Sequence, residues 1–144
     1  MPSSTVPGTS VRGLILLAHG SRDPLWRQPI EAVRVAVQAM QPDLPCLCAY
    51  LDACQPDLAA SVHSLTAQGS HHITILPLFL GTGKHAREDI PRQLQELRHQ
   101  YPDCQFELMT AAGENPRVTA LLAQLAIEAC RGESASNIQN PDKK

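Results

Sequence analysis

The sequence is poor in aromatic residues, which make up 3% of its 144 positions, and its formal net charge at pH 7 is only −2. Proteins that bind single-stranded nucleic acid stack bases on aromatic side chains within a basic surface. Because this chain has few aromatic residues and no excess of basic ones, we expect no nucleic-acid partner.

Cysteine pairs and long apolar runs are also missing. The five cysteines are odd in number and form no C-x-x-C motif, so neither a disulfide framework nor a zinc ribbon is indicated. No run approaches the roughly 18 apolar residues of a membrane span, and residues 1–13 lack the apolar core of a signal peptide. These features predict a soluble protein of the reducing cytoplasm with no membrane partner.

The length predicts one domain, since 144 residues is close to the roughly 150 residues of a typical domain. Residues 1–12 and 132–144 are rich in small and polar residues, and they have too few apolar side chains to offset the entropy of ordering. We therefore expect a single domain at residues 13–131 between two flexible terminal segments.

Short apolar runs alternate with helical stripes along this domain. We expect strands at about 13–18, 46–51, 72–80 and 105–110, and helices at about 25–40, 57–67, 88–100 and 116–130. Four strand–helix units in alternation predict an α/β fold with a mainly four-stranded parallel sheet flanked by helices.

Two histidines follow strands of this predicted sheet. His19 comes directly after the first strand, and His85 lies five residues beyond Leu80 at the end of the third. Ligands bind at the carboxyl ends of parallel strands, so both imidazoles could reach one cleft. Each histidine alone is compatible with an ordinary loop residue. Together they favour a site for a divalent metal and for proton transfer near neutral pH.

Two other loops leave alternatives open. Asp52 follows the second strand, where it could add a carboxylate to the cleft or serve as a turn residue. The segment Gly81-Thr82-Gly83-Lys84 has glycines and a lysine but not the full G-x-x-x-x-G-K-[ST] pattern. A flavodoxin-like nucleotide-binding module would use this loop for phosphate, but the incomplete pattern and the scarcity of aromatic residues disfavour it.

Four segments carry a family resemblance: LLAHGSRDPLW, AYLDACQPDL, ITILPLFLGTGKHAREDIP and AAGENPRV. In this order and spacing, over about residues 13–130, the chain resembles a small-form CbiX/SirB sirohydrochlorin chelatase. The resemblance implies a chelatase-like three-layer sandwich. It also implies ATP-independent insertion of Co²⁺, Fe²⁺ or Ni²⁺ into sirohydrochlorin, in siroheme or cobalamin biosynthesis. The metal is then a co-substrate, and no tightly bound cofactor is expected.

The resemblance also assigns site positions. It maps the two catalytic, metal-binding histidines onto His19 and His85, and it maps an acidic position, often glutamate in the family, onto Asp52 as a substrate contact. The substrate-contacting loop maps onto Leu80, Gly81, Thr82, Gly83, Lys84 and His85.

The chemistry of insertion explains these residue types. Two pyrrole protons must leave while a metal ion enters, which requires a base that titrates near neutral pH and ligands that release the metal. Our hypothesis is that His19 takes the protons while both histidines present the metal. Sirohydrochlorin is polyanionic, so Ser21, Arg22, Thr82 and Lys84 are expected to meet its carboxylates, although Arg22 and Lys84 could equally be solvated.

Two further expectations concern what surrounds the site. A non-catalytic metal or tetrapyrrole carrier could use the same two-histidine cleft, and it is the main alternative to an enzyme. Longer members of the family have two similar lobes that face one cleft. The resemblance therefore implies that this one-lobe chain forms a homodimer, in which each subunit supplies half of the enclosure.

Overall fold

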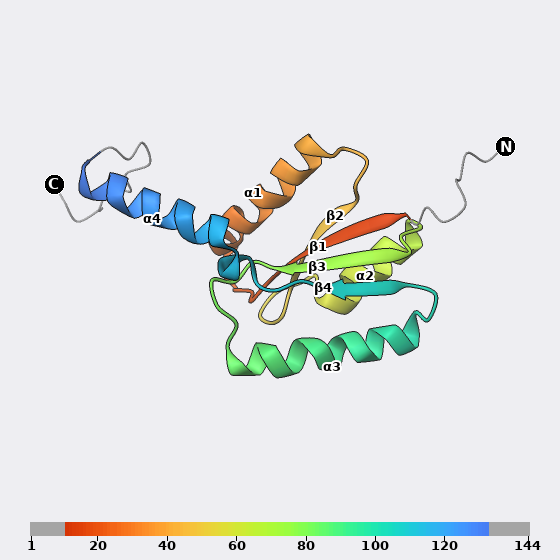
Figure 1. The fold of residues 1–144 in the computed structure, drawn as a ribbon. Helices are drawn as coiled ribbons and strands as arrows, with labels where there is room; N and C mark the ends of the chain where they lie inside the picture. Colours follow the sequence, from red (N-terminus) through yellow and green to blue (C-terminus); the bar gives the residue numbers. More distant parts are fainter. Residues whose placement is uncertain (1–10, 133–144) are drawn as a thin grey trace.

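The computed structural model describes residues 11–132, which form a sheet with helices on both faces (Figure 1). The elements in chain order are β1 (Arg12–Ala18), α1 (Pro24–Met40), β2 (Cys46–Tyr50), α2 (Leu58–Ala67), β3 (His72–Pro77), α3 (Lys84–Gln100), β4 (Gln105–Leu108), the short 3-10 helix η1 (Ala112–Glu114) and α4 (Pro116–Cys130). The four strands are parallel and lie in the order β2-β1-β3-β4. The predicted α/β fold is confirmed.

Two boundaries differ from the prediction in ways that affect the site. Helix α3 begins at Lys84, not near residue 88, because Gly83 is already its N-cap residue. Strand β3 ends at Pro77, so residues 78–83 form an irregular segment. Lys84 and His85, expected in a loop, therefore lie in the first turn of a helix.

The predicted terminal segments are only partly described. Strand β1 begins at Arg12, one residue before the expected domain boundary, because the carbonyl of Val11 already accepts hydrogen bonds from the backbone of His71 and His72. Residues 1–10 and 133–144 of the two segments lie outside the described residues.

The main core lies between the sheet and helices α2 and α3. Alternate residues of β1 and β3 point to this face, where they pack against apolar side chains of the two helices. The fully buried members of this cluster are Ile15, Leu17, Ala49, Leu58, Val62, Leu65, Ile73 and Ile75.

The opposite face of the sheet is covered by α1. Ile30 and Val37 of α1 pack over Leu16, Cys48 and other residues of β1 and β2. Cys46 and Cys48 alternate along β2, so they share this face, and both are buried. Helix α4 does not join this layer, and it extends away from the sheet (Figure 1). None of the helices within residues 11–132 has the length and apolarity that a bilayer span requires.

Candidate active site

A cavity of about 490 Å³ lies at the carboxyl edge of the sheet. Its walls come from the ends of β1 and β2 and from the start of α3: His19, Leu51, Asp52, Gly83, Lys84, His85, Ala86 and Asp89. The structure therefore brings together the two histidines and three more of the residues that the sequence singled out.

His19 is supported on one side by an aromatic ring. Its imidazole stacks on Phe79, with ring centroids 4.2 Å apart and an interplanar angle of 21°. Its backbone carbonyl accepts a hydrogen bond of 2.9 Å from the N–H of Asp52. The side chain is otherwise exposed. Phe79 thus holds one ring face while the imidazole edge remains available to the cavity.

The close approach of the β1 and β2 ends requires a glycine. Gly20 has φ = +107°, in the left-handed region, and a Cβ atom there would overlap the backbone carbonyl of Asp52. Because Gly20 lets the two loops touch, His19 and Asp52 lie on the same cavity wall.

Asp52 is both a turn residue and a cavity residue. Its Oδ1 accepts a hydrogen bond of 2.7 Å from the N–H of Ala53, which has a left-handed φ of +67°. The side chain is exposed and lines the cavity. The two roles considered for this residue coincide in the structure, since the turn contact orients the carboxylate.

The first turn of α3 supplies the opposite wall. Gly83 caps this helix without a side-chain hydrogen bond, so the first N–H groups have no side-chain partner and carry the partial positive charge of a helix N-terminus. Lys84 and His85 are exposed here. This wall therefore combines an imidazole with a lysine and helix N–H groups that favour anions.

Sequence reasoning missed Asp89, which lies one turn after His85 on α3 and lines the same cavity. Its carboxylate pairs with Arg92 and accepts a hydrogen bond of 2.8 Å from Gln93. The i, i+4 spacing from His85 was the available signal, but it applies only to a helix that starts at Lys84.

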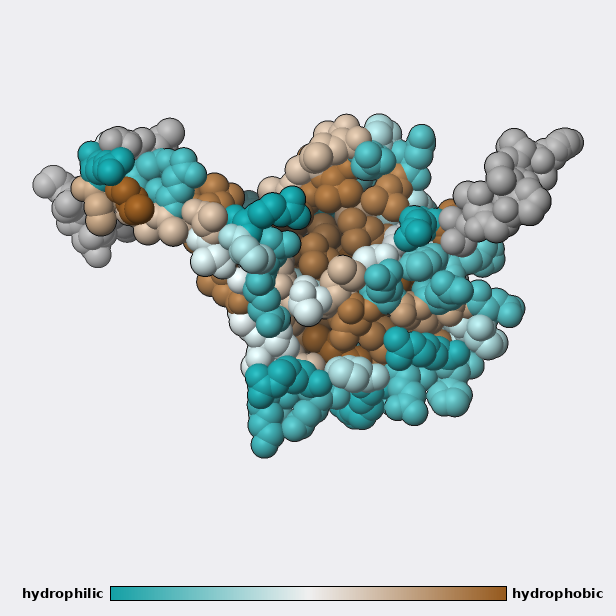
Figure 2. All heavy atoms as spheres, in the orientation of Figure 1, coloured by the Kyte–Doolittle hydropathy of each residue, from teal (hydrophilic) through white to brown (hydrophobic). Residues whose placement is uncertain are grey.

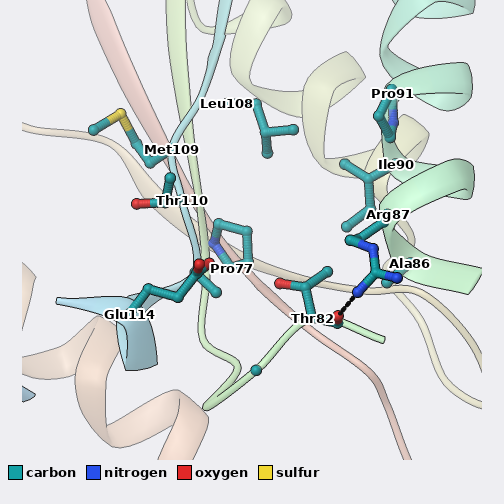
Figure 3. Close-up of a pocket in the computed structure, with 12 residues that line it drawn as sticks. Pro77, Thr82, Ala86, Arg87, Ile90, Pro91, Leu108, Met109, Thr110 and Glu114 are labelled. Atoms are coloured by element: carbon teal, nitrogen blue, oxygen red, sulfur yellow. Dashed lines mark hydrogen bonds between the residues drawn. The ribbon is translucent and has the colours of Figure 1, made fainter. Parts of the chain in front are cut away.

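Residues 78–83, the segment before α3, are held in place by contacts with η1 and with α3. The N–H of Gly113 in η1 donates to the carbonyl of Phe79 over 2.8 Å, and a side chain at Gly113 would overlap the backbone of Leu80. Arg87 donates from Nη1 to the carbonyl of Thr82 over 2.9 Å (Figure 3). These contacts fix the segment's path between β3 and α3.

Not all of the predicted substrate loop faces the histidines. Gly81 and Thr82 line a neighbouring cavity of about 480 Å³, whose walls include Pro77, Ile90 and Leu108 (Figure 3). Leu80 is 71% exposed and lines neither of these two cavities. Of the predicted substrate-contacting residues 80–85, only Gly83, Lys84 and His85 line the cavity that contains His19.

Ser21 and Arg22 also line neither of the two cavities. Ser21 Oγ accepts a hydrogen bond of 3.0 Å from the N–H of Asp23, whose own carboxylate caps the N-terminus of α1. Arg22 is exposed. The hydroxyl of Ser21 thus helps to shape the turn that follows His19.

The buried Tyr50, at the end of β2, links this strand to α1 through a side-chain hydrogen bond. The hydroxyl of Tyr50 donates to Glu31 over 3.1 Å. Burial by itself would raise the pKa of Glu31, but hydrogen bonds from Arg34, Cys48 and Tyr50 outweigh it and lower the pKa below its ordinary value. Burial, together with the adjacent Glu31 carboxylate, raises the pKa of Cys48 to about 12. This thiol therefore stays protonated and serves packing.

Within residues 11–132, no three His, Cys, Asp or Glu side chains are grouped closely enough to hold a metal ion. The cavity of a single copy offers the two imidazoles and the carboxylates of Asp52 and Asp89 on separate walls.

Comparison with known proteins places the chain in a family. A family model described as CbiX matches residues 13–129. The chain belongs to the CbiX family. This CbiX chain is 31% identical over 81 residues to the sirohydrochlorin cobaltochelatase of Methanopyrus kandleri, a match that covers 56% of the chain and 57% of the relative. It is 29% identical over 103 residues to the sirohydrochlorin cobaltochelatase of Saccharolobus islandicus, covering 69% of the chain and 79% of the relative.

Coverage differs among these relatives. The chain spans 57% of the length of the M. kandleri protein and also 57% of the sirohydrochlorin cobaltochelatase of Methanothermobacter thermautotrophicus. It thus spans less than two thirds of both proteins.

Solved structures share the fold of the CbiX chain. A CbiX protein from Marinobacter aquaeolei superposes with a TM-score of 0.70 at 28% identity, over 84% of this chain and 98% of that one. The sirohydrochlorin chelatase SirB from Bacillus subtilis, in complex with cobalt, superposes with a TM-score of 0.71 at 22% identity. That match covers 81% of this chain and 50% of SirB, so the CbiX chain has the fold of half of that longer protein.

Proposed function

We propose that this CbiX-family protein inserts a divalent metal ion, Co²⁺ or Fe²⁺ and by the same chemistry Ni²⁺, into sirohydrochlorin without ATP. The observation that carries the proposal is one cavity with His19 and Asp52 on one side and His85 on the other. The names of the cobaltochelatase relatives and the cobalt complex of SirB support the choice of substrate. The reaction would serve siroheme or cobalamin biosynthesis in the cytoplasm.

His19 is the proposed base. Insertion of a divalent ion releases two pyrrole protons, so the two positive charges of the metal replace the two of the protons and the net charge of the macrocycle does not change. The imidazole of His19 accepts a proton at the cavity and, because its edge is exposed, returns it to water before the next transfer. The stacking on Phe79 fixes the plane of the ring during these steps. Before the protons move, neutral His19 and His85 together present the metal to one face of the macrocycle. Once the metal has left the nitrogen of His19, that nitrogen is free to accept a proton.

The α3 wall is the proposed binding surface for the carboxylates of the macrocycle. Lys84 supplies a positive charge, and the free N–H groups of the first turn of α3 point toward the same end of the helix. Gly81 and Thr82 extend this surface beyond the histidine cavity. Ser21, Arg22 and Leu80 line neither cavity and are proposed as outer contacts of the macrocycle. The carboxylate of Asp52, which lines the same cavity as the two histidines, is the proposed contact for the pyrrole centre of the macrocycle.

A homodimer completes this site in the proposal. The described lobe provides one set of walls, and its fold corresponds to 50% of the SirB chain. A second copy would therefore occupy the place of the other half of that protein and enclose the macrocycle from the opposite side.

The test is anaerobic absorbance spectroscopy of sirohydrochlorin with Co²⁺, Fe²⁺ or Ni²⁺, each with and without the protein. The proposal expects the metal-free spectrum to convert to that of the metal complex faster with protein, without ATP, for at least one metal. Binding of metal or macrocycle with no rate above the protein-free control would instead identify a carrier.

A further inference from the structure

A second cavity lies beside the histidine cavity, and the proposed reaction leaves it without a role of its own. Its volume is about 480 Å³, within the range of roughly 300–1,000 Å³ that small-molecule pockets occupy. Ala86 lines both cavities, whereas the adjacent residues Thr82 and Gly83 each line one of them. A ligand that is wider than the histidine cavity therefore reaches the second cavity, which we call the side pocket.

The walls of the side pocket are largely apolar. Pro77 at the end of β3 and Ile90 of α3 are buried there, and Leu108 at the end of β4 is 37% exposed. Figure 2 shows hydrophobic residues at the surface between the sheet and α3, bordered by the hydrophilic surface of that helix. Such walls suit the methylene groups of a ligand, because covering them removes apolar surface from water.

Arg87 brings a positive charge to this pocket. Its Nη1 donates to the carbonyl of Thr82 over 2.9 Å (Figure 3). A guanidinium group has five N–H donors, so this bond leaves others for a ligand. Because the bond to the backbone already holds the guanidinium in one place, less entropy is lost when an anion binds to it.

Glu114 of η1 limits the charge that the pocket accepts. It lines the pocket together with Arg87, and Figure 3 shows it on the opposite wall. A carboxylate there repels anions, so a phosphate dianion or a second carboxylate is disfavoured. The pocket thus suits a single carboxylate at the Arg87 wall, carried on a short apolar stem.

We propose that the side pocket binds one carboxylate-bearing arm of the macrocycle, with the carboxylate on Arg87 and the methylene stem on Pro77 and Leu108. This assignment rests on the proposed function, since the macrocycle occupies the histidine cavity. An arm held in the side pocket prevents the ring from rotating above His19 and His85. Arg87 is then a specificity-determining residue, which distinguishes a tetrapyrrole with charged arms from one with an apolar periphery.

Titration of metal-free sirohydrochlorin with the protein, followed anaerobically by absorbance, tests the side pocket apart from the reaction. We expect Arg87→Gln to raise the Kd about five- to tenfold, between the effects of exposed and of buried charged hydrogen bonds. Arg87→Lys keeps the charge and recovers part of this loss. Arg12→Gln is the matched control. Arg12 is exposed at the start of β1, at the opposite edge of the sheet, so loss of its charge leaves the Kd unchanged.

Glu114→Gln gives a prediction of the opposite sign. It removes the repulsion across the pocket and leaves the hydrogen bond from Arg87 to Thr82 in place, so the Kd falls about two- to threefold. With fully methyl-esterified sirohydrochlorin, the wild type, Arg87→Gln and Glu114→Gln bind equally. If Arg87 served only to hold Thr82, neither result would be observed.

Metal insertion by the same variants separates the side pocket from the proposed reaction. Arg87→Gln raises the KM for sirohydrochlorin and leaves kcat unchanged, as expected for an interaction made equally in the ground state and the transition state. Equal Kd values for Arg87→Gln and Arg12→Gln, or an unchanged Kd for Glu114→Gln, overturn the assignment of the arm even if the wild type inserts metal. A wild type that binds the macrocycle with the expected differences in Kd but inserts no metal overturns the proposed function alone.

Discussion

The imidazole of His19 lies against the ring of Phe79, with centroids 4.2 Å apart and planes inclined by 21°. Phe79 belongs to the buried core between the sheet and α3, whereas His19 is exposed at the cavity. A buried residue of the third strand–helix unit thus supports an exposed residue of the first, and the orientation of the proposed base depends on the packing of the core.

Replacing Phe79 by leucine is expected to affect insertion more than stability. The leucine keeps most of the volume, so the free energy of unfolding falls by less than about 1.5 kcal/mol. Without the ring beneath it His19 rotates more freely, and we expect kcat for metal insertion to fall about tenfold, equivalent to about 1.4 kcal/mol, with little change in KM. Phe106→Leu, in the same core cluster, is the matched control. Equal rates of metal insertion in Phe79→Leu and Phe106→Leu would show that Phe79 does not position His19.

Gly113 is expected to tolerate no side chain. A Cβ atom there would overlap the backbone of Leu80, so Gly113→Ala must displace the segment between β3 and α3. We expect the free energy of unfolding to fall by about 1–3 kcal/mol and the rate of insertion to fall as well. Gly81→Ala, which meets no atom within 4 Å, should change the unfolding free energy by less than about 0.5 kcal/mol. Urea denaturation compares the two, and equal stability would contradict the assigned contact.

Glu31 is expected to make the free energy of unfolding depend on pH below neutrality. Its pKa is lowered in the folded protein because hydrogen bonds from Arg34, Cys48 and Tyr50 outweigh the effect of burial. A depressed carboxyl pKa stabilises the fold above the ordinary value of 4.5, and this contribution is lost as the pH falls through the folded pKa. The wild type should therefore be more stable than Glu31→Gln at pH 7, with the difference shrinking toward pH 3. Urea unfolding at several pH values measures this. A difference that stays constant would contradict the assigned pKa direction, and Glu96→Gln on the exposed side of α3 is the control.

The fold followed from periodicity because each strand is a short apolar run bounded by polar turns. The sequence also placed His19 and Asp52 correctly at the ends of β1 and β2, since strand ends define the carboxyl edge. The predicted start of α3, at about residue 88, is four residues too late. Gly81 and Gly83 are typical of a loop, so the sequence did not identify Gly83 as the N-cap. Asp89 was missed for the same reason.

Long-range contacts could not be predicted from local patterns. The stacking of His19 on Phe79 and the packing of Gly113 on Leu80 join residues that are distant in the sequence. The sequence predicted a helix at about 116–130, but the direction of that helix depends on the backbone bonds of Gly113 and Asn115. Only the three-dimensional arrangement shows that none of its residues is buried within the described part of one chain.

His19 and His85 are proposed to act together in inserting metal into sirohydrochlorin. The most direct measurement is the initial rate of Co²⁺ insertion, followed anaerobically by absorbance, for the wild type, His19→Ala, His85→Ala and His63→Ala. His63 is an exposed histidine on α2 that does not line the cavity, so its variant should match the wild type. Loss of a positioned base is expected to slow His19→Ala by about 10²–10⁴-fold, and His85→Ala should also fall far below the wild type. Near-normal rates in both cavity variants would contradict a joint role of the two histidines in metal insertion.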